Sequence, residues 1–328
     1  MMEQIEHHTA EMLSTLGKTR IFLSILCIVG IGLLSKFSWK YWVFSLDGQN
    51  SSFNTYINKC LPEDDPWFTT LINAAPPPFL TKNYTPSEGD FNWWKRLQGE
   101  KRNFTFYKTT VDSLFNIFPP ISDILESNPV RCRTCAVVGN SVNLKGSHYG
   151  PLIDMHDIVI RMNRGRTKGF EEDVGTKTTH HVMYPESAIF LDNDDIHLVL
   201  FSFKIKDLLW LLKRFDPREI SAGKLKKIAN KDRVMIVNPA LLKYVHEMWL
   251  EKKGRYPSTG FLTLALSLQI CDAVSVFGFG ADSAGSWSHY FETFRYKNFK
   301  TGVHAGPHEY SVIQQLYQKK KILFFKGS

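Results

Sequence analysis

From Trp93 onward, short apolar runs of β-rich composition alternate with stretches of helical periodicity. Helical stretches are expected at 239–250 and 259–268, and strands at 136–138, 158–160, 198–201, 234–237, 274–277 and 322–325. This alternation predicts βαβ crossovers and an α/β fold, in which helices cover both faces of a mostly parallel central sheet. Ligands of such sheets bind at the carboxyl ends of the strands. We therefore look for chemistry in the residues that directly follow each strand.

The N-terminal region has a different pattern. Residues 21–34 form a charge-free, mostly apolar run, which Lys18 and Arg20 precede and the aromatic and lysine residues of 35–42 follow. A run this short is also compatible with a signal peptide or a buried helix. The interfacial flank and the lack of a nearby small-x-small cleavage site favour a signal-anchor helix over 21–41, after a cytoplasmic tail of residues 1–20. Basic residues before the span predict a type II protein, with everything after it in the lumen.

Residues 42–92 are predicted to be a lumenal stem, because turn-forming residues and the Pro76–Pro78 run make them loop-like. Glycosylation sequons begin at Asn50, Asn83 and Asn103 and agree with a lumenal location. Residues 93–328 then form the main globular domain, which has the size of one large α/β domain.

The composition is that of a globular protein, with 43% hydrophobic and 22% charged residues, and the net charge is +8. A basic balance suits acidic partners of several kinds. The chain has no basic arm with interleaved aromatic residues and no zinc-finger or RRM pattern, so nucleic acid is not an expected partner. The lysine-rich stretches at 224–227 and 319–321 are interpreted as solvated faces.

The chain contains five cysteines, of which Cys27 lies in the apolar N-terminal run. Cys132 and Cys135 form a lone C-x-x-C, a pattern found in redox sites and in halves of zinc sites. No second C-x-x-C or histidine pair follows at zinc spacing, so a zinc site is disfavoured. With Cys60 and Cys271, the four cysteines of a lumenal domain fit two structural disulfides.

Two of the predicted strands end in amide side chains. Gly139, Asn140 and Ser141 follow the first strand, and Asn163 follows the second. A glycine turn lets backbone N–H groups approach an anionic ligand, and the two asparagines could converge on one nucleotide. The first turn lacks the other glycines of G-x-G-x-x-G, which disfavours an NAD-dependent oxidoreductase. Ordinary turns after strands are the competing interpretation.

Later turns carry further candidates. Ser258 or Thr259 can cap a helix that starts near Gly260, and the free N–H groups of that helix could bind an anion or a nucleobase. Gly280 lies in a glycine turn after another strand. His289 and His304 follow, and histidine is the side chain best suited to take a proton near neutral pH. A merely capped helix and structural histidines are the alternatives.

Asp192 and Asp194 match the D-x-D pattern by which many glycosyltransferases hold a divalent metal. They belong to an acidic loop that precedes a strand rather than follows one. We interpret this loop as solvated and expect no metal site.

Together these segments resemble the animal sialyltransferases, glycosyltransferase family 29. Residues 135–186 are similar to the large sialylmotif, 238–272 to the small motif, 289–292 to the third motif and 304–309 to the very small motif H-x-x-x-x-E. All four occur in order. Residues 93–98, the His180–His181 pair and residues 280–283 look most like the β-galactoside α-2,3-sialyltransferases that act on Galβ1,3GalNAc.

The resemblance implies a GT-A-like fold of the sialyltransferase type, a Golgi membrane location and inverting, metal-independent transfer. N-acetylneuraminic acid would pass from CMP-Neu5Ac to the 3-OH of a terminal galactose on a glycoprotein or glycolipid, with no cofactor. It implies disulfides Cys60–Cys132 and Cys135–Cys271. The residue roles that it implies are a general base, His304; acceptor contacts, Gln98 and Tyr256; a donor-phosphate contact, His289; and a lining of the CMP site, Asn140, Asn163, Ser258, Thr259, Gly260 and Gly280.

Two features depart from the family pattern. Members of this subfamily usually carry a C-x-C-x-x-C cluster in the stem, and only Cys60 is present here. A tyrosine expected to contact the donor phosphate is absent, and an ungapped alignment puts Ile220 in its place. An α-2,6 or α-2,8 linkage, or a non-catalytic lectin-like paralogue, therefore stays an alternative, and a homodimer is left open.

Overall fold

The structure, a computed structural model, describes residues 65–84, 86–119, 132–292 and 300–327. All of them belong to one compact unit, Lys59–Ser328. The predicted tail and anchor, Asn50, and Cys60 lie outside the described residues. Among the helices that are described, none combines the length and apolar character needed to cross a bilayer.

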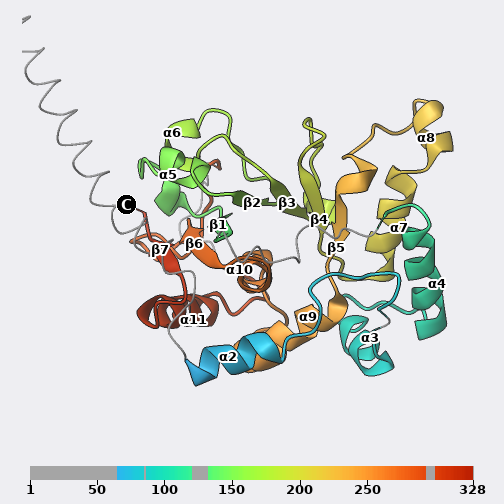
Figure 1. Cartoon of the computed structure of the whole chain (residues 1–328), viewed down its shortest axis with the longest axis horizontal. Helices are drawn as coiled ribbons and strands as arrows, with labels where there is room; N and C mark the ends of the chain where they lie inside the picture. Colours follow the sequence, from blue (N-terminus) through green and yellow to red (C-terminus); the bar gives the residue numbers. More distant parts are fainter. Residues whose placement is uncertain (1–64, 85, 120–131, 293–299, 328) are drawn as a thin grey trace, which may run out of the picture. The chain divides into compact units, whose positions relative to one another are not determined.

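The centre of the fold is a seven-stranded sheet in the order β5-β4-β3-β2-β1-β6-β7 (Figure 1). Every neighbouring pair of strands is parallel. The strands are β1 (Thr134–Val138), β2 (Ile158–Met162), β3 (His180–Met183), β4 (His197–Leu200), β5 (Val234–Ile236), β6 (Ala273–Phe277) and β7 (Leu323–Phe325). The sequence analysis missed β3.

Helices cover both faces of the sheet, as a doubly wound α/β fold requires, with α5 and α6 on one side and α10 and α11 on the other (Figure 1). The helices are α2 (Pro66–Asn73), α3 (Glu88–Trp94), α4 (Phe104–Phe115), α5 (Gly150–Asp154), α6 (Glu171–Val174), α7 (Ile205–Arg214), α8 (Pro217–Ser221), α9 (Pro239–Tyr244), α10 (Thr259–Ile270) and α11 (Gly306–Gln318). Short 3-10 turns are η1 (Val142–Leu144), η2 (Pro185–Ser187) and η3 (Lys231–Arg233), and a π-helical turn, η4 (Val245–Trp249), extends α9.

Two local predictions need correction. The expected helix at 259–268 is present as α10, but it is buried around almost its whole circumference instead of being amphipathic. It packs against β1, β2 and β6, at the centre of the molecule. Part of the stretch predicted to be loop-like is helical. Asp65 caps α2, and the helix buries Phe68 and Leu71. The stem boundary at residue 92 remains a prediction, although residues 65–84 belong to the same compact unit as the sheet.

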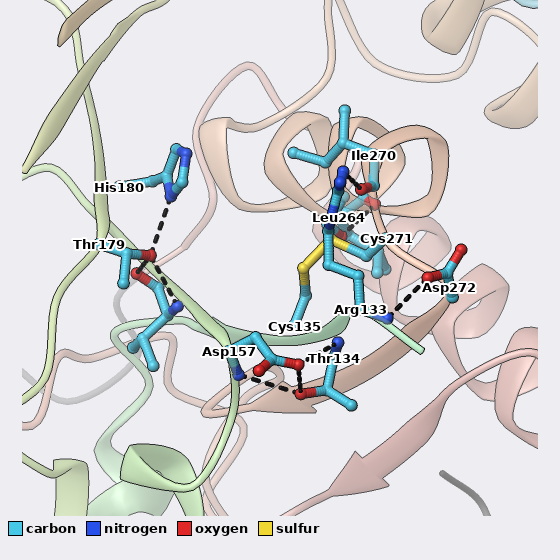
Figure 2. The surroundings of a disulfide bond; sticks show 12 residues. Arg133, Thr134, Cys135, Asp157, Thr179, His180, Leu264, Ile270, Cys271 and Asp272 are labelled. Atoms are coloured by element: carbon cyan, nitrogen blue, oxygen red, sulfur yellow. Dashed lines mark hydrogen bonds between the residues drawn. A yellow bond between two sulfur atoms is a disulfide. The ribbon is translucent and has the colours of Figure 1, made fainter. Parts of the chain in front are cut away.

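A disulfide links strand β1 to the end of the helix that packs against it. Cys135 on β1 is bonded to Cys271, the residue that ends α10, and the link joins positions 136 residues apart (Figure 2). Next to it, the backbone N–H of Arg133 donates to the Asp272 carboxylate at 2.6 Å. The predicted Cys135–Cys271 pair is thus confirmed. Cys132 is also disulfide-bonded, while its pairing with Cys60 stays a prediction.

Two predicted surface features can be located. Asn83 and Asn103 are exposed, and the Asn103 amide oxygen caps α4 by accepting from the N–H of Phe106. Their glycosylation stays a prediction. Asp192 and Asp194 are exposed in the loop before β4, where Lys226 and Lys227 pair with them. The solvated interpretation of this loop agrees with that placement.

Candidate active site

The pocket that contains most of the predicted residues lies at the point where the strand order of the sheet reverses. From β1 the chain proceeds through β2 to β5 on one side, and β6 and β7 lie on the other. The loops that leave β1 and β6 therefore diverge, and the space between them is the usual ligand site of such sheets. A cavity of about 460 Å³ occupies this place, and it is lined by the turns after β1, β2 and β6, by the N-terminus of α10 and by residues near the start of α11.

An aromatic ring lies between two of the predicted glycines. A Cβ atom on Gly139 would lie 2.9 Å from the Phe279 ring, and one on Gly260 would lie 3.0 Å from it. The first distance is too short for a Cβ atom, and a Cβ on Gly139 would also lie 2.3 Å from the carbonyl oxygen of Gly278. At Gly260 the ring would have to shift by a few tenths of an ångström to admit a side chain. Phe279 thereby holds the β1 turn and the start of α10 at a fixed spacing.

The two strand-end asparagines lie next to each other, as the sequence analysis expected. The Asn140 amide donates to the carbonyl oxygen of Met162 at 3.3 Å, and Met162 directly precedes Asn163. The hydroxyl of Ser187 donates to the amide oxygen of Asn163 at 2.9 Å. This bond fixes the orientation of the Asn163 amide and leaves its N–H groups for a ligand. Both asparagines line the pocket.

A buried histidine on the neighbouring strand holds the backbone of Asn163. His181 on β3 donates from Nε2 to the carbonyl oxygen of Asn163 at 2.7 Å. Burial lowers the pKa of His181 to about 4, so the ring is neutral near pH 7. Asn163 itself has a φ of 55°, in the left-handed region that asparagine tolerates better than most residues. His181 is thus a supporting residue of the site.

Helix α10 begins at the pocket. Ser258 is its N-cap, and the hydroxyl accepts from the N–H of Phe261 at 3.1 Å. Within the described part of the chain, the N–H groups of Thr259 and Gly260 have no hydrogen-bond partner. Both residues line the pocket, so the positive end of the helix is available to an anionic or hydrogen-bond-accepting ligand.

A buried carboxylate joins the starts of α10 and α11. Glu309 accepts from the backbone N–H of Ser258 at 2.7 Å and from its hydroxyl at 2.6 Å. Its exposed fraction is only 6%. Burial raises the pKa of Glu309 above its ordinary value, although its two bonds to Ser258 and the charge of His304 act in the opposite direction. Ser258 is therefore occupied mainly with this link and with capping.

His304 lies at the edge of the same pocket. Its Nδ1 is 2.9 Å from the carbonyl oxygen of Tyr256, and the two rings meet edge to face with centroids 5.0 Å apart. A carbonyl can only accept, so Nδ1 carries the proton and Nε2 keeps its lone pair. The Thr301 hydroxyl also donates to the backbone oxygen of His304 at 2.9 Å. The ring is therefore oriented as a base with one nitrogen available.

His289 lies on the β1 side of the pocket. Its Nδ1 is 2.7 Å from the carboxylate of Glu292, which orients the ring, and its backbone forms a bridge with Ser141. The next N–H, of Tyr290, donates to the carbonyl oxygen of Asn140 at 3.0 Å. The third motif, residues 289–292, is thus hydrogen-bonded to the turn after β1.

The structure brings eight of the predicted residues into one cavity, and the two predicted acceptor residues lie outside its lining. Tyr256 lies against His304, whereas Gln98 is exposed and bonds to Lys204. Ile220 is in α8 and does not line the pocket either. Lining residues that the sequence analysis did not select include Tyr184, Phe279, Trp287, Lys300, Glu309 and Tyr310. The position of Tyr184 directly after a strand was a usable signal, but β3 had been missed.

In the part of the chain that the structure describes, no three His, Cys, Asp or Glu side chains gather as a metal site would require. Among the described lining residues, the charged groups at the pocket are Lys300 and the bonded Glu309, beside the two histidines.

Comparisons with known proteins agree with this geometry. The family model of glycosyltransferase family 29 (sialyltransferase) matches residues 79–321. The CMP-N-acetylneuraminate-beta-galactosamide-alpha-2,3-sialyltransferase 1 of Sus scrofa is 44% identical over 285 residues, which cover 82% of this chain and 81% of that protein. The Homo sapiens protein of the same name is 44% identical over 273 residues, covering 80% and 78% of the two chains.

A solved structure is similar as well. The crystal structure of a mammalian sialyltransferase in complex with Gal-beta-1-3GalNAc-ortho-nitrophenol matches with a TM-score of 0.71 and 44% identity. The match covers 80% of this chain and 95% of that one. The seven-stranded parallel sheet with its covering helices is thus the fold of a mammalian sialyltransferase.

Proposed function

The chain belongs to glycosyltransferase family 29, the sialyltransferases, and we propose that it forms α-2,3 linkages to the galactose of Galβ1,3GalNAc. CMP-N-acetylneuraminate is the donor. The observation that carries this proposal is the 44% identity, over 80% of the chain, to a mammalian sialyltransferase whose structure contains a Gal-beta-1-3GalNAc compound.

The pocket suits the cytidine monophosphate part of the donor. Asn140 and Asn163 offer amide groups, and Thr259 and Gly260 offer unpaired N–H groups at the start of α10. Gly280 gives the backbone room on the opposite side, and His289 lies where a phosphate could meet an imidazole. These groups together provide the donor with hydrogen bonds and with the positive end of a helix. Most of the contacts come from neutral groups.

His304 is the proposed general base. In a single in-line step, Nε2 of His304 takes the proton of the galactose 3-OH while that oxygen bonds to the anomeric carbon of the sialic acid. The bond from the anomeric carbon to the phosphate oxygen breaks, and CMP leaves with the electron pair. Because the nucleophile and the leaving group occupy opposite faces, the configuration inverts. Tyr256 keeps Nδ1 protonated throughout, so the base has one defined nitrogen.

Metal-independent transfer is part of the proposal because of the leaving group. The phosphate leaves the anomeric carbon as CMP, a phosphate monoester, and it departs readily as oxocarbenium character develops. The remaining tasks are to stabilise the phosphate, to position the acceptor hydroxyl and to remove its proton. Hydrogen bonds and an imidazole can perform all three.

The location and processing of the protein follow the same proposal. We infer a Golgi type II membrane protein, with an anchor at 21–41, a stem up to residue 92 and a lumenal catalytic domain. Galactose-terminated glycans on glycoproteins or glycolipids are the partners. The exposed Asn83 and Asn103 and the disulfide at Cys135 are compatible with a lumenal domain.

The test is an acceptor panel incubated with CMP-Neu5Ac and EDTA, followed by linkage analysis of the products. The expected result is α-2,3-sialylated Galβ1,3GalNAc at a rate that chelation does not change. An α-2,6 or α-2,8 product would overturn the linkage. Donor binding with neither transfer nor hydrolysis would indicate the lectin-like alternative.

A further inference from the structure

A lysine next to the predicted acceptor residue has all three of its hydrogen-bond donors engaged. The ammonium of Lys204, which precedes α7, lies 2.7 Å from Oε1 of Gln98. It also lies 2.8 Å from a carboxylate oxygen of Glu186 and 3.0 Å from one of Asp207. Burial alone lowers the pKa of Lys204, but the bonds to Glu186 and Asp207 raise it above the ordinary value. The group is therefore a fixed cation.

The cation determines which way the Gln98 amide faces. An ammonium can donate but cannot accept, so only the amide oxygen of Gln98 can bond to it. The N–H₂ end then points away from Lys204. Gln98 itself is exposed, so this end is accessible from solvent. A glutamine free of the lysine could present either end, whereas this one presents donors only.

This cluster adjoins the pocket on the side of β3 and β4. Phe203, directly before Lys204, has its ring centroid 5.4 Å from that of Tyr256, which in turn lies 5.0 Å from that of His304. Tyr184, a lining residue of the pocket, meets the same Phe203 ring edge to face at 5.9 Å. The aromatic contacts thus connect the lysine cluster to the proposed base.

The cluster is also connected to the donor side. Glu186, which accepts from Lys204, is followed in η2 by Ser187, and the Ser187 hydroxyl holds the amide oxygen of Asn163. One short turn therefore joins the lysine to a proposed donor contact. The Lys204 ammonium is thus bound by Glu186 on the donor side, and it holds Gln98 on the acceptor side.

We propose that Lys204 is a positioning residue, which fixes the Gln98 amide so that the acceptor is recognised by N–H groups. The recognised atom of the sugar is then an oxygen that accepts, either a hydroxyl oxygen or a ring oxygen. The inference rests on the proposed function and on the contact with the acceptor galactose that the family resemblance implies for Gln98.

The sharpest test is Gln98→Glu. This change keeps the shape of the side chain and gives Lys204 an ionised partner, so the thermal midpoint is expected to stay the same or rise. It removes both N–H donors and keeps the accepting oxygens. The KM for Galβ1,3GalNAc should therefore rise about tenfold, equivalent to one lost hydrogen bond, while the KM for CMP-Neu5Ac stays within about twofold. An unchanged acceptor KM would overturn the proposal, because the N–H groups of Gln98 would then not recognise the sugar.

A second pair of variants tests the lysine itself. Lys204→Met should raise the acceptor KM and leave the donor KM unchanged, and Lys204→Arg should restore part of the acceptor affinity. Lys206→Met is the matched control, since Lys206 is exposed on the first turn of α7 and makes no contact with Gln98. Equal changes in both KM values for Lys204→Met in a folded protein would overturn the positioning role. If Lys204→Met fails to fold because Asp207 loses its partner, Gln98→Glu still decides. A wild-type protein without transfer activity would instead refute the proposed function.

Discussion

Replacing Glu309 by glutamine tests how the buried carboxylate serves the site. The carboxylate accepts two bonds from Ser258, at 2.7 and 2.6 Å, and is 6% exposed. Glutamine has the same shape, can accept one of these bonds and can donate to the Ser258 hydroxyl. The variant is therefore expected to fold, with the link between α10 and α11 kept in a neutral form.

The stability of the two proteins should depend differently on pH. Burial raises the pKa of Glu309 in the folded protein above the ordinary 4.5. An acid with a raised pKa contributes stability in its protonated form, which is fully present below the unfolded pKa and lost as the pH rises through the folded pKa. Between these two pKa values the wild type should lose up to about 1.4 kcal/mol per pH unit relative to Glu309→Gln. This corresponds to roughly 3–6 °C in the thermal midpoint per pH unit.

Although Glu309→Gln should gain stability relative to the wild type as the pH rises, it should lower kcat. The attraction between ionised Glu309 and a protonated His304 acts on the pKa of Glu309 against burial. The same attraction stabilises the imidazolium that forms when His304 takes the acceptor proton. Glu309 is bonded to Ser258 and not to His304, so an attraction of about 1 kcal/mol is expected, and its loss corresponds to a roughly fivefold fall in kcat for Glu309→Gln.

Thermal unfolding from pH 4.5 to 7.5, together with kcat at saturating donor and acceptor, measures both effects. With rising pH, the wild type should lose stability relative to Glu309→Gln, while its kcat stays higher. A stability difference that is constant over this range, or that grows with pH, would refute the assignment of a raised pKa. An unchanged kcat would refute the role of the carboxylate beside His304.

Three further outcomes are expected. Gly280→Ala should destabilise the fold by about 1–3 kcal/mol and weaken CMP binding, because φ is +100° and a Cβ would lie 2.6 Å from the Tyr310 ring. The control is Gly285→Ala, where φ is also positive but a Cβ would meet open space. Equal losses of stability in the two variants would argue against the steric contact with Tyr310. Cys271→Ser should cost about 2–5 kcal/mol in denaturant unfolding under non-reducing conditions, and an unchanged midpoint would show that the link to Cys135 contributes little. Dialysis against EDTA should leave the transfer rate unchanged, and restoration of a lost rate by Mg²⁺ or Mn²⁺ would contradict metal-independent transfer.

The sheet was largely predictable because its strands are buried on both faces. Strands β1 and β6 are apolar runs that are buried along their whole length, and such runs stand out in a sequence. Strand β3 did not, since it begins with His180 and His181, which count as polar. Both are nevertheless buried: His180 stacks on His197 at 4.5 Å, and His181 bonds to Asn163. Tertiary contacts hold these rings in place, although Nε2 of His180 has no hydrogen-bond partner among the described residues. A local pattern cannot reveal such contacts.

The site was predictable where it follows a strand and hidden where distant segments meet. Asn140, Asn163 and Gly280 come directly after strands, so their convergence followed from the parallel sheet. The bond between Gln98 and Lys204 joins positions 106 residues apart, and the link from Glu309 to Ser258 spans 51. Such contacts depend on how the crossovers pack, which short-range periodicity does not specify. Phe279 was not selected, because the sequence does not show that its ring lies between Gly139 and Gly260.

The central claim is that the imidazole at position 304 removes the acceptor proton. It is tested most directly by the transfer rate of His304→Ala with CMP-Neu5Ac and Galβ1,3GalNAc, alongside the dissociation constant for CMP. His308→Ala, four residues further along in α11 and outside the pocket lining, is the control. The account predicts that His304→Ala loses about 10²–10⁴-fold in rate, while CMP binds within about threefold of the wild-type affinity. Near-normal turnover by His304→Ala would contradict it.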